Sequence, residues 1–212
     1  MKVALLTTPE PSTSPAEAEL ARVLPELAAH FQLRLFVDRG LAGGELSGCR
    51  LEDVSTFDPH GFEQVVYAIG NAAGHGYMLP VIRRVGGVAA LFEWNLSQAA
   101  HAAYPGLAAG GALTSWLTVR EGRAGDGQEP VLNRSVVRYA DAFLVPDETL
   151  GTRVLEDRND PTPITVFQAS AEGTAATWIE ALETFPRHRV ARKSVLRSMF
   201  DALRRRAVTQ DA

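Results

Sequence analysis

Short apolar runs alternate along the chain with stretches in which apolar residues recur at helical spacing. The first run, Lys2–Thr7 (KVALLT), predicts a strand, and Pro15–Phe31 repeats apolar residues every three to four positions, which predicts a helix. Ser14 and Glu17 stand three residues apart at the start of this helix, the spacing of a capping box. Gln64–Ile69 (QVVYAI) lacks polar alternation, which is typical of a strand buried on both faces.

The same alternation continues to about residue 185. Strands separated by helices of this length predict right-handed βαβ units and a parallel sheet covered on both faces. We therefore predict an α/β fold, a Rossmann-like doubly wound parallel sheet over residues 1–185. The remaining predicted strands are Leu33–Val37, Val88–Phe92, Ala142–Val145 and Ile164–Phe167, and the remaining helices are Tyr77–Val85, Pro130–Tyr139, Thr149–Asp157 and Thr174–Phe185.

In such a fold, ligands bind beside the carboxyl ends of the strands. The residues that directly follow the predicted strands are therefore the first candidates for a site, although this topological argument does not identify a ligand. They are Thr7–Thr8, Asp38, Gly70–Asn71, Glu93–Asn95, Pro146–Asp147 and Gln168.

Several motifs common on this fold are missing. The loop after the first strand, TTPEPSTSP, has no glycine, so standard dinucleotide binding is not expected. The chain also has neither a P-loop nor a G-x-S-x-G nucleophile elbow. The five histidines show no metal-ligand spacing, and the lone Cys49 excludes an internal disulfide and a multi-cysteine zinc site. We predict no metal site.

Composition is that of a globular chain, with 212 residues, 46% hydrophobic and 22% charged. This length fits one domain with a short appendage. No apolar run approaches the roughly 18–20 residues of a membrane span, and the N-terminus fits a strand better than a signal peptide. The simplest expected location is the cytoplasm.

The net charge of −4 hides an asymmetry between the body and the C-terminus. Residues 186–212 carry eight Lys/Arg and two acids, which leaves about −10 on the first 185 residues. So acidic a body argues against nucleic-acid binding. Within this basic segment, Val190–Arg206 predicts an amphipathic helix, which packs on its own domain, joins a partner or another copy, or makes a peripheral membrane contact. Its apolar stripe consists of Val195, Leu196, Met199, Phe200 and Leu203.

Three segments together carry a resemblance to a known family. They are Tyr67–Pro80 (YAIGNAAGHGYMLP), Gly87–Leu96 (GVAALFEWNL) and Leu132–Leu155 (LNRSVVRYADAFLVPDETLGTRVL). In order and spacing this chain resembles, over roughly residues 1–168, the N-terminal half of GT-B glycosyltransferases of family 4. That family shows a Y-x-x-G-N…H-x-Y-M-x-P stretch, a strand leading into an H-D turn, and then N-R…A-D…V-x-S-E…V.

The resemblance implies one half of a GT-B architecture, the acceptor side of an enzyme that transfers a sugar from an activated donor. The nucleotide-sugar donor would be held by a second Rossmann-like domain, so it is expected only with a donor-domain partner, and no other cofactor is implied. Carried over by position, Glu93 and His75 are the candidate catalytic residues. The candidate substrate-binding residues are Asn71, Asn95, Asp147 and Trp116.

The sequence also departs from the family pattern. Phe92 stands where the family has the histidine of its H-D turn, and Asp147 stands where it has the serine of V-x-S-E. After Phe167 only about 45 residues remain, against about 150 for a donor domain. We therefore expect the isolated chain to be inactive. It is either the acceptor half of a split glycosyltransferase or a catalytically inactive descendant used for binding or assembly, and a small-molecule sensor is a third hypothesis.

Each candidate residue has a structural alternative. Asn71 follows Gly70, a strong turn signal, and Glu93 is equally explained as a capping or ion-paired carboxylate. Asp147 opens the helix Thr149–Asp157, where N-capping is the better interpretation. Trp116 is equally explained by packing. Arg134 and Arg138, four residues apart on one helical face, fit solvated surface better than an anion site.

Overall fold

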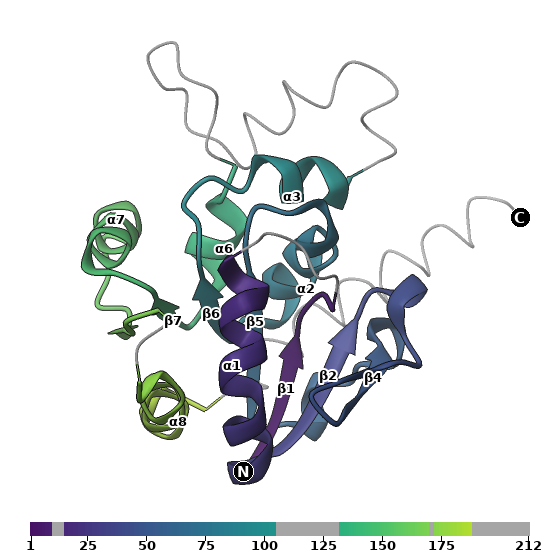
Figure 1. Ribbon diagram of the computed structural model, residues 1–212. Helices are drawn as coiled ribbons and strands as arrows, with labels where there is room; N and C mark the ends of the chain where they lie inside the picture. Colours follow the sequence, from purple (N-terminus) through teal and green to yellow (C-terminus); the bar gives the residue numbers. More distant parts are fainter. Residues whose placement is uncertain (10–14, 105–131, 170–171, 188–212) are drawn as a thin grey trace, which may run out of the picture.

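The computed structural model describes residues 1–9, 15–104, 132–169 and 172–187 (Figure 1). Four predictions therefore concern residues outside these ranges, at least in part. They are the capping residue Ser14, the binding residue Trp116, the basic amphipathic helix in 186–212, and the helix predicted over residues 130–139. The predicted helix 130–139 is described from residue 132 onward, and in that part it begins only at Arg134.

The described residues form an α/β fold with an eight-stranded sheet in the order β3-β4-β2-β1-β5-β6-β7-β8. Every pairing is parallel except the one between β3 and β4. This arrangement confirms the predicted Rossmann-like parallel sheet. The strands are β1 (Lys2–Leu6), β2 (Gln32–Val37), β3 (Glu45–Leu46), β4 (Cys49–Asp53), β5 (Gln64–Ile69), β6 (Val88–Leu91), β7 (Ala142–Val145) and β8 (Ile164–Val166).

Helices cover both faces of the sheet (Figure 1). α1 and α8 pack on one face, while α2, α3, α6 and α7 pack on the other. Both core clusters draw on alternate residues of the central strands: in β5, Tyr67 and Ile69 face α2, whereas Val66 and Ala68 face α1 and α8. The helices are α1 (Pro15–His30), α2 (Met78–Val85), α3 (Ser97–Ala103), α6 (Arg134–Tyr139), α7 (Glu148–Arg158) and α8 (Thr174–Thr184).

Two parts of the fold were not predicted from the sequence. The first is the β3–β4 hairpin, whose two-residue turn places Ser47 and Gly48 at positive φ (50° and 78°), as tight hairpins require. The second is α3, whose sequence SQAAHAA lacks the large apolar residues from which helical periodicity is recognised. Its buried alanines, Ala99 and Ala100, instead allow close packing.

The strand order reverses direction between β1 and β5. From β1 the chain builds outward through β2 and β4, then returns to pair β5 with the other side of β1 and continues outward through β6, β7 and β8. The loops after β1 and β5 therefore diverge at this point. Such a topological switch point is where doubly wound sheets form their ligand-binding crevice.

Candidate functional site

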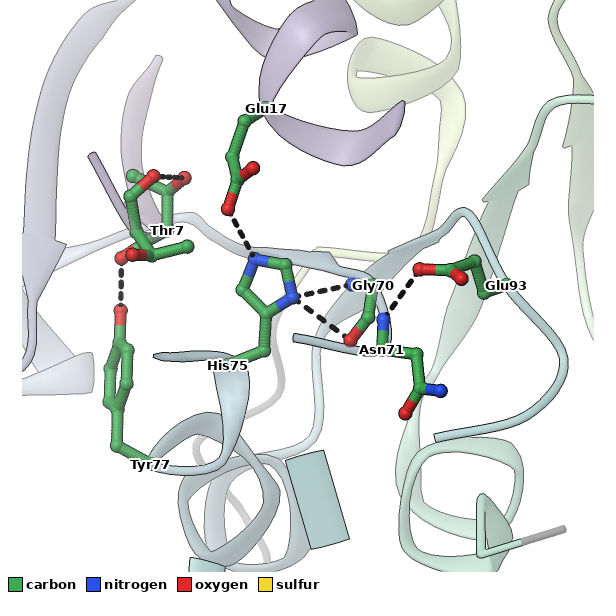
Figure 2. A network of polar contacts seen from close by, with 8 residues as sticks. Thr7, Glu17, Gly70, Asn71, His75, Tyr77 and Glu93 are labelled. Atoms are coloured by element: carbon green, nitrogen blue, oxygen red, sulfur yellow. Dashed lines mark hydrogen bonds and ion pairs between the residues drawn. The ribbon is translucent and has the colours of Figure 1, made fainter. Parts of the chain in front are cut away.

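Polar side chains gather at this switch point (Figure 2). They come from the end of β1, from the first turn of α1 and from the segments that follow β5 and β6. Side chains from four separate segments thus meet at the edge of the sheet that the topology marks for a ligand. We call the following residues the switch-point cluster: Thr7, Glu17, Gly70, Asn71, His75, Tyr77 and Glu93.

His75 lies at the centre of the cluster and is 0% exposed. Its Nδ1 lies 2.9 Å from both the backbone nitrogen and the carbonyl oxygen of Gly70. On the other side of the ring, Nε2 lies 3.5 Å from Oε1 of Glu17, whose side chain is 9% exposed. The imidazole thus bridges α1 and the end of β5 in the protein interior and is not exposed at the surface.

The glycines on either side of His75 let this loop enter so confined a space. A Cβ at Gly74 would lie 3.1 Å from Oγ1 of Thr8, in the loop after β1. A Cβ at Gly76 would lie 2.7 Å from the carbonyl oxygen of Ala99, in α3. The close backbone approach that these glycines allow is therefore to the end of β1 and to α3.

Glu93 and Asn71 form the second half of the cluster. The half-buried Glu93, just after β6, accepts a hydrogen bond of 2.6 Å from the backbone N–H of Asn71 through Oε2. The side chain of Asn71 accepts a 2.8 Å bond from the backbone N–H of Gln98 in the first turn of α3. Asn71 can therefore be both a turn residue and a member of the cluster. Its side-chain oxygen binds the first turn of α3, while its backbone N–H binds Glu93.

Tyr77 ties the cluster to the sheet. Its hydroxyl lies 2.7 Å from the carbonyl oxygen of Thr7 and 2.9 Å from that of Phe36, so it joins the ends of β1 and β2. Burial raises the pKa of Tyr77 well above its ordinary value of 10, so the phenol stays protonated and donates. From the sequence, Tyr77 is predicted only as a helix residue and Glu17 only as part of a capping box. Their contacts in the cluster join residues far apart in the chain, which local spacing does not reveal.

The other candidate residues have local structural contacts. Asn95 is exposed and its Oδ1 accepts a 2.9 Å bond from the backbone N–H of Ser97, which begins α3 beside Asn71 and Glu93. Asp147 caps α7 through a 2.8 Å bond from the N–H of Leu150, which confirms the N-capping interpretation. Arg134 and Arg138 are exposed on α6.

The cap on α7 gives a direct prediction. Asp147→Ala removes the acceptor for the Leu150 N–H and should lower the free energy of unfolding by about 1 kcal/mol. Asp147→Asn retains an acceptor oxygen and should cost less than half of that loss. Urea denaturation measures both variants, and equal losses in the two would contradict a capping role.

Within the described ranges, no group of three or more His, Cys, Asp or Glu side chains could hold a metal ion. No helix in the same ranges is long and apolar enough to cross a membrane. A scan of the chain against protein-family models finds no matching model, and a search of curated proteins finds no match either.

Proposed function

We propose that this chain is the acceptor-side half of a GT-B-type glycosyltransferase, with an acceptor hydroxyl bound at the switch-point cluster and the nucleotide-sugar donor held by a separate donor-domain partner. The support is the Rossmann-like strand order, the position of the cluster at the switch point, and the family resemblance of the segments that build it. Of the two candidate catalytic residues, Glu93 would contact the acceptor, whereas the buried His75 would act only through its contacts with the loop that binds Glu93.

The observation that carries this proposal is the state of the Glu93 carboxylate. The Asn71 N–H fixes Oε2 at 2.6 Å, and within the described part of the chain Oε1 accepts no hydrogen bond. A half-buried carboxylate with one oxygen fixed and the other directed elsewhere suits a hydroxyl-binding group or general base. In transfer, the acceptor oxygen would bond to the anomeric carbon of the donor sugar, the bond from that carbon to the leaving phosphate would break, and the hydroxyl proton would pass to Oε1.

One observation favours the alternative, a catalytically inactive binding or assembly protein. Phe92, which stands in place of the family histidine, is 7% exposed and packs on the core, with its ring centroid 5.6 Å from that of Phe167 and 6.4 Å from that of Trp178. This position supplies an aromatic core contact with α8 and no polar group for the crevice. If transfer has been lost, an acceptor-binding function of Glu93 could still remain.

Saccharide binding to the full chain tests the role of Glu93. A panel of mono- and disaccharides is titrated into ¹⁵N-labelled protein, and we expect shifts of the Asn71, Glu93 and Gln98 amides. Glu93→Gln keeps an acceptor for the Asn71 N–H but removes the charge, so it should weaken binding about tenfold, the effect of one charge-assisted hydrogen bond. Glu63→Gln is the matched control, because Glu63 also accepts a backbone N–H, that of Lys2 at 2.9 Å.

The outcomes separate the hypotheses. Saccharide shifts elsewhere on the sheet, or a Kd unchanged by Glu93→Gln, would contradict the assigned site. Binding without transfer after reconstitution with a donor-domain protein captured by the tagged chain would favour the inactive descendant. Transfer by that pair, lost in Glu93→Gln and retained in Glu63→Gln, would support the split enzyme.

A further inference from the structure

A single peptide group lies between His75 and Glu93. Its carbonyl oxygen belongs to Gly70 and lies 2.9 Å from Nδ1 of His75, while its N–H belongs to Asn71 and donates to Glu93 over 2.6 Å. A donor that polarises the carbonyl of a peptide group strengthens the hydrogen bond that its N–H makes, because the two share one delocalised system. The imidazole is therefore connected to the Glu93 carboxylate through this peptide, without direct contact (Figure 2).

The contact with Gly70 differs between the two protonation states of the imidazole. When Nδ1 carries no proton, it accepts from the Gly70 N–H at 2.9 Å, and Nε2–H points toward Glu17. When the ring is protonated, Nδ1–H repels that N–H and donates to the Gly70 carbonyl, which is at the same distance. Among the states in which Nε2–H faces the Glu17 carboxylate, only the protonated ring also donates to the Gly70 carbonyl and so polarises the peptide toward Glu93.

The Glu17 carboxylate faces the fully buried ring. Burial disfavours the imidazolium, whereas a carboxylate at 3.5 Å favours it, and these effects oppose each other. In the described part of the chain, the other titratable side chains of the switch-point cluster are Tyr77, two residues after His75, and Glu93, beyond the peptide. Tyr77 stays neutral, so Glu17 and Glu93 are the two carboxylates of the cluster, and Glu17 is the one that faces the ring.

We propose that Glu17 and His75 are positioning residues that set, through the Gly70–Asn71 peptide and according to the protonation of His75, the strength with which Asn71 holds the carboxylate of Glu93. This inference rests on the proposed function only in assigning acceptor binding to the Glu93 carboxylate. The coupling itself belongs to the free protein. Asn71 is also tied to α3 through Gln98, so the peptide is held on both sides and responds by polarisation rather than by displacement.

NMR on the full chain without any saccharide tests this inference. The ring nitrogens of His75 report its protonation state, and the amide proton of Asn71 reports the hydrogen bond to Glu93. On acidification we expect the Asn71 amide to move downfield with the same midpoint as the His75 ring. The Lys2 amide, which donates to Glu63, is the internal reference and should not follow that midpoint.

Glu17→Gln removes the charge but keeps a side chain of the same shape that also serves a capping box. It should lower the His75 midpoint by about one pH unit, the effect of an opposite charge at this range, and the Asn71 midpoint should fall equally. Glu26→Gln, an exposed position on the same helix, should move neither. A purely structural role for Glu17 would change the thermal midpoint and leave both titrations in place.

Two results would overturn the inference: an Asn71 amide that does not titrate with the ring, or a His75 midpoint unchanged by Glu17→Gln. Failure of the saccharide titration would not affect either NMR measurement, because both are made on the protein without saccharide. The proposed function and this coupling can thus fail separately.

Discussion

Gly87→Ala is expected to destabilise the protein by about 3–5 kcal/mol, one of the larger losses that a single methyl group can cause. Gly87 precedes β6 and has a φ of +110°, where L-residues are strained. A Cβ there would also lie 2.5 Å from the carbonyl oxygen of Val65 in β5. Relief of this contact would require β6 to move away from β5, and Glu93 lies in the segment that follows β6.

Differential scanning calorimetry should show the thermal midpoint of Gly87→Ala lowered by roughly 10 °C for a chain of this size. The control is Gly40→Ala, since Gly40 has no atom within 4 Å of its would-be Cβ and no positive φ. That variant should remain within about 0.5 kcal/mol of the wild type. A loss below about 1 kcal/mol in Gly87→Ala would mean that β6 does not need this close approach.

Gln64→Glu should produce a loss of stability that grows as pH rises. Gln64 is fully buried at the start of β5, and its amide nitrogen faces three carbonyl oxygens at the end of α8, those of Leu182 (3.3 Å), Phe185 (3.2 Å) and Pro186 (3.3 Å). A carboxylate in this place would face those oxygens without a donor. The folded protein would therefore favour the protonated form of the new carboxyl group, with its pKa raised above that of the unfolded chain.

The sign of the pH dependence follows from this raised pKa. The folded state then binds more protons than the unfolded state, so stability relative to wild type should fall by up to about 1.4 kcal/mol per pH unit above roughly pH 4.3. We expect a deficit of about 3 kcal/mol at pH 7 that shrinks to about 1 kcal/mol at pH 4. Urea denaturation at each pH measures it.

Gln64→Leu is the matched control for this titration. It loses the same hydrogen bonds without adding a charge, so its deficit should not change with pH. A deficit of Gln64→Glu that is constant between pH 4 and pH 7 would contradict the close contact between this side chain and the end of α8.

In the switch-point cluster, the residues proposed for function also hold the local structure together. Asn71 forms hydrogen bonds with both α3 and Glu93, and the buried His75 forms a hydrogen bond with the backbone of Gly70. Substituting either residue by alanine would disturb the loop as well as any chemistry. The conservative changes Glu93→Gln and Glu17→Gln avoid this because the new side chains retain their shape and an acceptor oxygen.

Features that depend on neighbours in the chain were predictable from the sequence alone. Alternating buried strands and amphipathic helices predict a parallel sheet, since each pattern reflects which faces an element must bury. The same applies to the cap on α7, where Asp147 and Leu150 are three residues apart. Topology also predicted that Asn71, Glu93 and Asn95 lie at one edge of the sheet, and the structure brings these three residues together at the start of α3.

What only the tertiary structure decided are the contacts between residues distant in the chain. Glu17 and His75 meet because α1 and the loop after β5 border the same switch point, and no local pattern encodes that meeting. Likewise, strand alternation places Phe92 on the same face as Val88 and Ala90, but only packing shows that α8 covers that face with Trp178. Local spacing sets the shape of each element, whereas the burial of apolar faces sets which elements meet, and the contacts of the switch-point cluster depend on the second.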